Sequence, residues 1–227
     1  GPMVIEVVVN DPDVKDTDEA KGEPDVTING DILRMVQATD GLWYAYFADE
    51  EQADLADATA DVAGFGLDFG TKCDRTNTDL SSTGALDLFS DTQGFYTTQV
   101  ACTDGAGGDI TNVVREEKTP NTDGIALPGQ IGIDVAAWPV IQLYDLNPTG
   151  NVVIQYNKGG NPQTVTLTFD TLDGTLDASL DRDVYPQGSA LHATLTDQAM
   201  NIDPTDEDSW TFDTAAGTTF YQFFDES

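Results

Sequence analysis

The chain has 227 residues, of which 41 are acidic and 9 are basic, so its formal net charge at pH 7 is −32. A protein this acidic has no cluster of Lys or Arg with which to displace the counterions of nucleic acid, and anionic lipid headgroups repel it. At 39% hydrophobic residues the chain can still fill a core. We therefore expect a folded, very acidic protein that binds neither nucleic acid nor a membrane surface.

The sequence shows neither a spanning segment nor the pattern of an N-terminal signal peptide. No run approaches the roughly 18 apolar residues of a spanning helix, and the N-terminus lacks the charged and apolar regions of a signal peptide. Gly1-Pro2 is typical of a protease-cleavage scar left by expression, and Met3 is assigned to the same remnant, residues 1–3. We expect the chain to be a piece of a longer protein, with no membrane insertion in this piece.

Short runs of β-branched and aromatic residues recur along the chain, each bounded by Gly, Asp, Asn or Pro. This pattern is typical of antiparallel strands. Residues 157–162 (NKGGNP) separate two such runs, so residues 152–169 form the clearest predicted hairpin. In chain order the predicted strands are residues 4–9, 25–28, 32–36, 42–47, 95–102, 140–144, 152–156, 164–169, 190–196 and 210–212.

Two segments depart from the strand pattern. Residues 49–61 (DEEQADLADATAD) are rich in alanine, and Asp49 is a candidate N-cap, so we predict one short helix there. Residues 64–129 are rich in Gly, Thr, Ser and Asn and are predicted to be a loop-rich insertion. Pro128 and Gly129 then favour a domain boundary near residue 130, which gives two β domains at residues 4–130 and 131–227.

Cys73 and Cys102 are the two cysteines of the chain, and neither has the spacing of a metal-binding pair. An even pair in an acidic, strand-rich sequence favours a disulfide made in an oxidising compartment. It would tie the insertion down and contribute roughly 3–4 kcal/mol in the chain-entropy model. Two separate buried thiols are the alternative.

The sequence offers little for catalysis. It has none of the motifs of zinc proteases, serine hydrolases, phosphate-binding loops or dinucleotide-binding turns. His192 is the one histidine, and an exposed position on a strand accounts for it better than a role as base or metal ligand. A carboxylate pair for glycoside hydrolysis would arise by chance among 41 acids. We expect no enzymatic activity.

Ca²⁺ is the metal that the sequence favours, because Asp-rich loops after strands supply the oxygen ligands it needs. Two loops qualify, although neither has the glycine spacing of an EF-hand. Acidic side chains that only cap turns are the alternative interpretation. The candidate ligands are Asp11, Asp13, Asp16, Asp18 and Glu19 in the first loop and Asp197, Asp203, Asp206, Glu207 and Asp208 in the second.

The two loops belong to similar sequence units, residues 7–19 and 193–207, each a strand followed by Asp, an apolar anchor and Thr-Asp-Glu. Such a recurrence suggests tandem domains of one kind. The segment SLDRDVYPQGSALHATLTDQAMNIDPTDEDSWTF at residues 179–212 resembles the surface-layer proteins of ammonia-oxidising archaea. GNVVIQYNKGG at residues 150–160, VVVNDPDV at 7–14 and DTDEA at 16–20 resemble the same family, and together these segments cover about a third of the 227 residues.

The resemblance implies a secreted protein of tandem immunoglobulin-like, antiparallel β-sandwich domains. Such proteins assemble into a two-dimensional lattice around the cell, which is acidic, porous and commonly associated with divalent cations. The chain departs from the family in having no N-glycosylation acceptor, because proline blocks the one at Asn147. Residues 64–130 match nothing in the family.

We therefore expect an all-β structural protein at the extracellular cell surface. Its partners would be copies of itself in a lattice, and its acidic surface would attract small cations such as ammonium. The alternative function is that of a calcium-dependent adhesion or ligand-binding module. A third, enzymatic interpretation is a carboxylate hydrolase.

Overall fold

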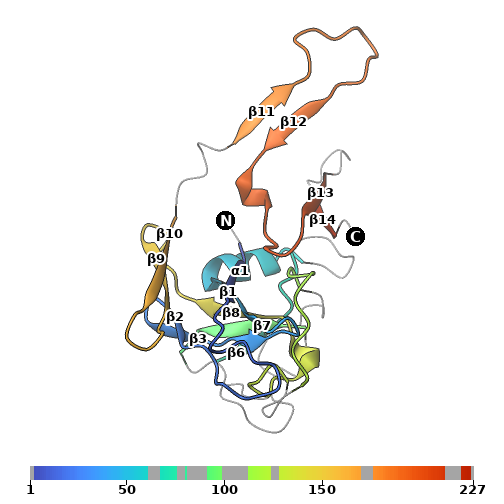
Figure 1. The fold of residues 1–227 in the computed structure, drawn as a ribbon. Coiled ribbons are helices and arrows are strands. Elements are labelled where there is room, and N and C mark those ends of the chain that lie inside the picture. The colour runs from blue at the N-terminus through green and yellow to red at the C-terminus, as the bar shows by residue number, and fades with distance from the viewer. Residues whose placement is uncertain are drawn as a thin grey trace.

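The fold is taken from a computed structural model, which describes residues 3–60, 67–75, 80, 91–98, 112–123, 128–169, 176–212 and 221–225. The described chain is mostly β-structure with one short α-helix, as predicted (Figure 1). Its strands form two larger sheets and two separate two-stranded ribbons.

The larger sheet has six strands. Its path runs through β1 (Ile5–Val9), β5 (Trp43–Asp49), β8 (Val140–Tyr144), β7 (Gly94–Thr97) and β6 (Thr71–Asp74), and β4 (Val36–Gln37) also pairs with β5.

One pair in this sheet corrects the prediction of purely antiparallel strands. β5 and β8 run parallel, with Tyr46 opposite Ile141. A parallel pair needs a long crossover connection. The long segment between β5 and β8, which begins with the α-helix, provides it.

The smaller sheet has the order β10 (Gln163–Thr168), β9 (Asn151–Tyr156), β2 (Val26–Ile28) and β3 (Asp31–Leu33), and all its pairs are antiparallel. The β9–β10 hairpin confirms the hairpin predicted at residues 152–169. The boundary predicted near residue 130 does not separate the sheets. Strands from both sides of that residue pair within each of them.

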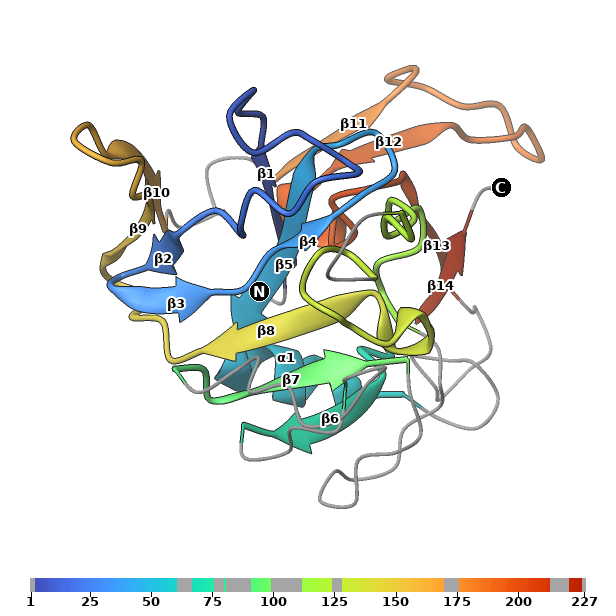
Figure 2. The same ribbon diagram turned by 60° about the horizontal axis from the view of Figure 1, so that its bottom comes forward.

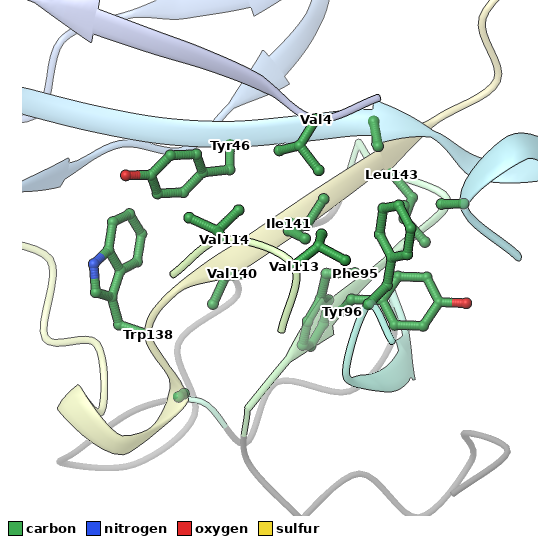
Figure 3. Packing of buried hydrophobic residues seen from close by; sticks show 14 of the residues in the cluster. Val4, Tyr46, Phe95, Tyr96, Val113, Val114, Trp138, Val140, Ile141 and Leu143 are labelled. Atoms are coloured by element: carbon green, nitrogen blue, oxygen red, sulfur yellow. The ribbon is translucent and has the colours of Figure 1, made fainter. Parts of the chain in front are cut away.

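The larger sheet is buried on both faces, which explains why β5 reads as a continuous apolar run instead of alternating. One face carries Trp43 and Phe47, which pack with residues of the smaller sheet such as Ile28 and Val152. The opposite face carries Tyr46, which packs in a second cluster shown in Figure 3. The smaller sheet, the larger sheet and the helix with its neighbouring loops therefore form successive layers.

Helix α1 (Glu50–Asp57) follows β5 directly. Asp49 is its N-cap, as predicted, and the Asp49 side chain accepts a hydrogen bond from the Gln52 N–H at 3.0 Å. Ala53 and Ala56 are buried against the larger sheet's second cluster. In the part of the chain that the structure describes, no helix has the length and apolar character needed to cross a membrane.

Two ribbons complete the described chain: β11 (Asp177–Leu180) with β12 (Ala193–Thr196), and β13 (Asp208–Phe212) with β14 (Tyr221–Asp225). The β11–β12 ribbon extends away from the two sheets in both ribbon views (Figures 1 and 2). Short 3₁₀ turns occupy Val135–Ala137 and Gln198–Met200.

The predicted disulfide falls partly outside the described residues. Cys73 lies in β6 and its side chain is fully buried. Cys102 and much of the insertion predicted at residues 64–129 lie outside the described ranges, so the bond between the two cysteines stays a prediction.

Candidate assembly surface

The first predicted metal loop begins with an acid that fastens it to the protein. Asp11 is 6% exposed, and its carboxylate accepts hydrogen bonds from the Tyr156 hydroxyl and the Asp13 N–H, both at 2.9 Å. The Lys158 ammonium lies 2.6 Å from the same carboxylate and holds the pKa of Asp11 at about 2. Lys158 also lies 3.1 Å from Asp13. These contacts anchor the loop to β9 and to the turn after it.

The other acids of the first loop interact with each other and with one lysine. The Asp16 carboxylate accepts a hydrogen bond from the Asp18 N–H at 3.4 Å and lies 3.6 Å from the Lys21 ammonium. Glu19 also pairs with Lys21. The carboxylates of Asp16 and Glu19 are thus engaged within a few residues of their own position.

The second loop holds one acid that is almost completely buried. Asp203 is 2% exposed, and it accepts hydrogen bonds from the Thr205 N–H and hydroxyl at 2.8 and 2.6 Å and from the Arg115 N–H at 3.0 Å. Asp208 accepts from the N–H groups of Ile202 and Asp203. Both carboxylates therefore satisfy backbone donors at the base of the β11–β12 ribbon.

The remaining acids of the second loop also lie at turns. Asp197 accepts a hydrogen bond from the Ala199 N–H at 2.9 Å, and Asp206 accepts one from the Glu207 N–H at 2.8 Å. Among the described residues, no group of three or more His, Cys, Asp or Glu side chains is arranged to hold a metal ion. The turn-capping alternative accounts for the contacts observed, and the Ca²⁺ site stays a prediction.

The β11–β12 ribbon has one apolar and one polar face. Its register places Ala178 opposite Leu195 and Leu180 opposite Ala193, and side chains two positions apart share a face. Leu195 is 64% exposed and Leu180 is 56% exposed. The opposite face carries the polar side chains Asp177, Ser179, Thr194 and Thr196.

Leu176 and Leu191 continue the apolar face just outside the strands, since they lie two residues before Ala178 and Ala193. Both are more than half exposed. An isolated two-stranded ribbon is only marginally stable in water, and a contiguous exposed apolar patch marks an interaction surface. This face is therefore a candidate interaction surface.

The body of the protein holds the ribbon at its base. Ile202, which follows β12, is 1% exposed and belongs to the buried cluster beside the larger sheet. Its carbonyl oxygen accepts a hydrogen bond from the Val4 N–H at 3.2 Å. The ribbon is therefore fixed at one end and free of the sheets along its length (Figure 1).

Exposed apolar side chains gather in this part of the chain. Of the twelve large apolar side chains that are exposed among the described residues, seven lie in or beside β10, β11 and β12. These are Val165, Phe169, Leu176, Leu180, Val184, Leu191 and Leu195.

The same region is nearly free of charge. Residues 146–169, which include β9 and β10, contain one charged side chain, that of Lys158. Residues 184–196, which include β12, contain no Asp, Glu, Lys or Arg. Because 41 of the 227 residues are acidic, four acids would be expected on average in a stretch as long as residues 146–169. The two segments are therefore charge-poor parts of a strongly negative chain.

Two hollows lie between β1 and the β9–β10 hairpin. One has a volume of about 320 Å³ and is lined by Val7, Val9, Ile154, Tyr156 and Val165, among others. The second has a volume of about 540 Å³, and its lining includes Val4, Leu167, Phe169 and Ile202. The apolar face of β10 therefore borders both hollows.

His192 lies on the ribbon, directly before β12, and its side chain is exposed, as the sequence predicted. Its N–H lies 3.3 Å from a carboxylate oxygen of Asp181, which also accepts from the Tyr185 hydroxyl. These contacts brace the ribbon where its strands part.

Comparisons with the models of known protein families and with the sequences of curated proteins gave no match for this chain.

Proposed function

We propose that the chain is a non-enzymatic structural component of an extracellular cell-surface layer, in which it assembles with copies of itself. The observation that carries this proposal is the exposed, amphipathic β11–β12 ribbon, fixed at its base and lying outside the sheets. Stable monomers rarely leave such a face uncovered. The immunoglobulin-like sandwich is part of the proposal; two packed sheets support it, and the parallel β5–β8 pair departs from it.

Charge restricts how two copies can meet. Each carries −32, so acidic surfaces brought together repel one another and raise the free energy of association. Contacts through residues 146–169 and 184–196 avoid most of that repulsion, because these segments carry one positive charge between them. Exposed apolar side chains and missing acids coincide in the same segments, which favours a second copy as the partner.

The remaining surface would attract cations. A compact body of 227 residues has a radius of gyration of about 17 Å, or a radius near 22 Å as a sphere. At 0.15 M salt, a charge of −32 on this sphere gives a surface potential worth about 1.6 kcal/mol per unit charge. That corresponds to an enrichment of monovalent cations such as ammonium by roughly tenfold at the surface, and the enrichment falls as salt shortens the screening length.

The test is electron microscopy combined with ion transport. At 0.5 M NaCl, where repulsion is screened, the concentrated chain should form ordered arrays, whereas an adhesion module would stay monomeric until it met a different partner. A layer of the assembled protein on a porous support should pass ammonium faster than chloride in dilute salt, and the difference should shrink at high salt. Equal passage of both ions in dilute salt would contradict the cation-attracting role, and a chain that forms no arrays would contradict the structural role.

A further inference from the structure

The sheets differ in how their edge strands are protected. An exposed edge presents unpaired N–H and C=O groups, and proteins usually block it with charged side chains, proline, a bulge or short length. Among the described strands, β1 carries Glu6 at its edge, β3 is three residues long and carries Asp31, and β6 carries Lys72 and Asp74. Each of these edges has at least one such protection.

The edge at β10 has none of them. Its six residues, QTVTLT, contain neither charge nor proline, and they pair with β9 without a break from Gln163 to Thr168, so there is no bulge. Five of the six are exposed. No described strand pairs with the outer side of β10.

β12 has the same character. Its four residues, ATLT, are all exposed and uncharged, and among the described strands they pair with β11 alone. In β10, Thr166 and Thr168 flank Leu167, just as Thr194 and Thr196 flank Leu195 in β12. Each strand therefore presents a row of threonines on one face and aliphatic side chains on the other.

We propose that β12 of one copy adds as a strand to the outer edge of β10 in a second copy. This inference rests on the proposed self-assembly and specifies the contact through which it occurs. Backbone hydrogen bonds along the two free edges supply affinity, and the side-chain rows set the register.

The alternation selects one face of the joined sheet. With Leu195 on the same face as Val165 and Leu167, the threonines of both strands lie together on the other face, where cross-strand Thr–Thr pairs are favourable. A slip by one residue would place leucine among the threonines. In the favoured register the apolar face of the ribbon continues the face of β10 that borders the two hollows beside β1.

The contact uses different surfaces on the two partners. Each copy offers one β12 as donor and one β10 as acceptor, so the interface is head-to-tail and can extend from copy to copy. It joins the two charge-poor segments, residues 146–169 and 184–196, and keeps the acidic surfaces apart.

A complementation experiment tests the contact in the full chain. Val165→Lys blocks the acceptor strand, and Leu195→Lys blocks the donor strand; these side chains are 58% and 64% exposed, so both variants should fold. Leu55→Lys is the control, because Leu55 is 61% exposed in α1, outside both charge-poor segments, and the variant has the same change in charge. Mass is measured by sedimentation at 0.5 M NaCl, where the screening length is about 4 Å.

The wild type and Leu55→Lys should form species larger than dimers, while Val165→Lys and Leu195→Lys should each sediment at the monomer mass of 24.3 kDa. Mixing these two variants should produce a one-to-one dimer, since one keeps its donor and the other its acceptor. Hydrogen exchange of the wild type gives a second readout. On assembly it should slow about tenfold in peptides covering residues 163–168 and 193–196.

Other outcomes overturn the inference in distinguishable ways. If Leu195→Lys self-associates and Val165→Lys does not, the contact is between the β10 strands of two copies. If Val165→Lys self-associates and Leu195→Lys does not, the contact is between two ribbons. If both variants assemble as the wild type does, strand addition is wrong while the proposed self-assembly stands. If the wild type stays monomeric, both are wrong.

Discussion

Shortening Leu195 to alanine should weaken association without weakening the fold. The side chain is 64% exposed in the single chain and lies on the apolar face of the ribbon. Its contacts within the monomer are therefore few, and the free energy of unfolding should change by no more than about 0.5 kcal/mol. Leu143→Ala is the matched control, because Leu143 is fully buried in β8. It should lower the free energy of unfolding by about 2–5 kcal/mol.

The effect on association follows from the area still open to burial. A leucine-to-alanine change removes three carbons, which are worth about 2.4 kcal/mol when fully buried. With 64% of the side chain left to bury, the loss is about 1.5 kcal/mol, or roughly a tenfold increase in the dissociation constant.

Two measurements on the same variant separate these effects. Urea unfolding at concentrations where the chain is monomeric gives the stability, and sedimentation equilibrium at higher concentration gives the dissociation constant. A drop in unfolding free energy as large as that of Leu143→Ala would show that Leu195 is already covered within the monomer. A dissociation constant unchanged within twofold would show that the apolar face takes no part in assembly.

Three further predictions follow from the buried and acidic groups. Burial raises the pKa of Asp57 to about 6, above its unfolded value of about 3.9, because the folded protein favours the protonated carboxyl. The contribution of Asp57 to the free energy of unfolding is therefore fully present below pH 4 and is lost as the pH rises through 6. Asp57→Asn should therefore be more stable than the wild type at pH 7.5, by about 1 kcal/mol after allowing for partial exposure, and equally stable below pH 4. A difference between the urea midpoints of the two proteins that is the same at both pH values would contradict this prediction. Millimolar CaCl₂ should raise the melting temperature more than NaCl at matched ionic strength if the acidic loops bind Ca²⁺, and equal shifts would leave only screening. Thiol titration of the unfolded, unreduced chain should find no free thiol if Cys73 and Cys102 are bonded, and two would reject the disulfide.

Local signals predicted several elements well. The β9–β10 hairpin followed from two β-branched runs around NKGGNP, and α1 followed from the Asp49 cap and the alanines after it. In both cases the information lies within about twenty residues of sequence. The pairing of β5 with β8 was not predictable in this way, because it joins strands separated by a long crossover.

The acidic loops show a different limit. Asp203 and Asp197 occupy the sequence context of metal ligands, yet in the structure both accept hydrogen bonds from nearby N–H groups. Turn capping and cation binding draw on the same side chains, so sequence alone could not separate them.

The sequence predicted one of the two strands of the candidate assembly surface. A strand was expected at residues 190–196, whereas β11 was missed because Asp177 and Ser179 are uncommon in strands. The two segments share the pattern Leu-x-Ala-x-Leu, in LDASL at residues 176–180 and LHATL at 191–195. That repeated alternation was the available signal for an amphipathic ribbon.

The central claim is that copies of this chain join through neutral, apolar β-surfaces while their acidic surfaces repel. Sedimentation of the unmodified chain over a series of NaCl concentrations tests it most directly. We predict that the average mass rises from 24.3 kDa in dilute salt to beyond that of a dimer as salt screens the charge of −32. A mass that stays at 24.3 kDa throughout, or association that weakens as salt is added, would contradict the account.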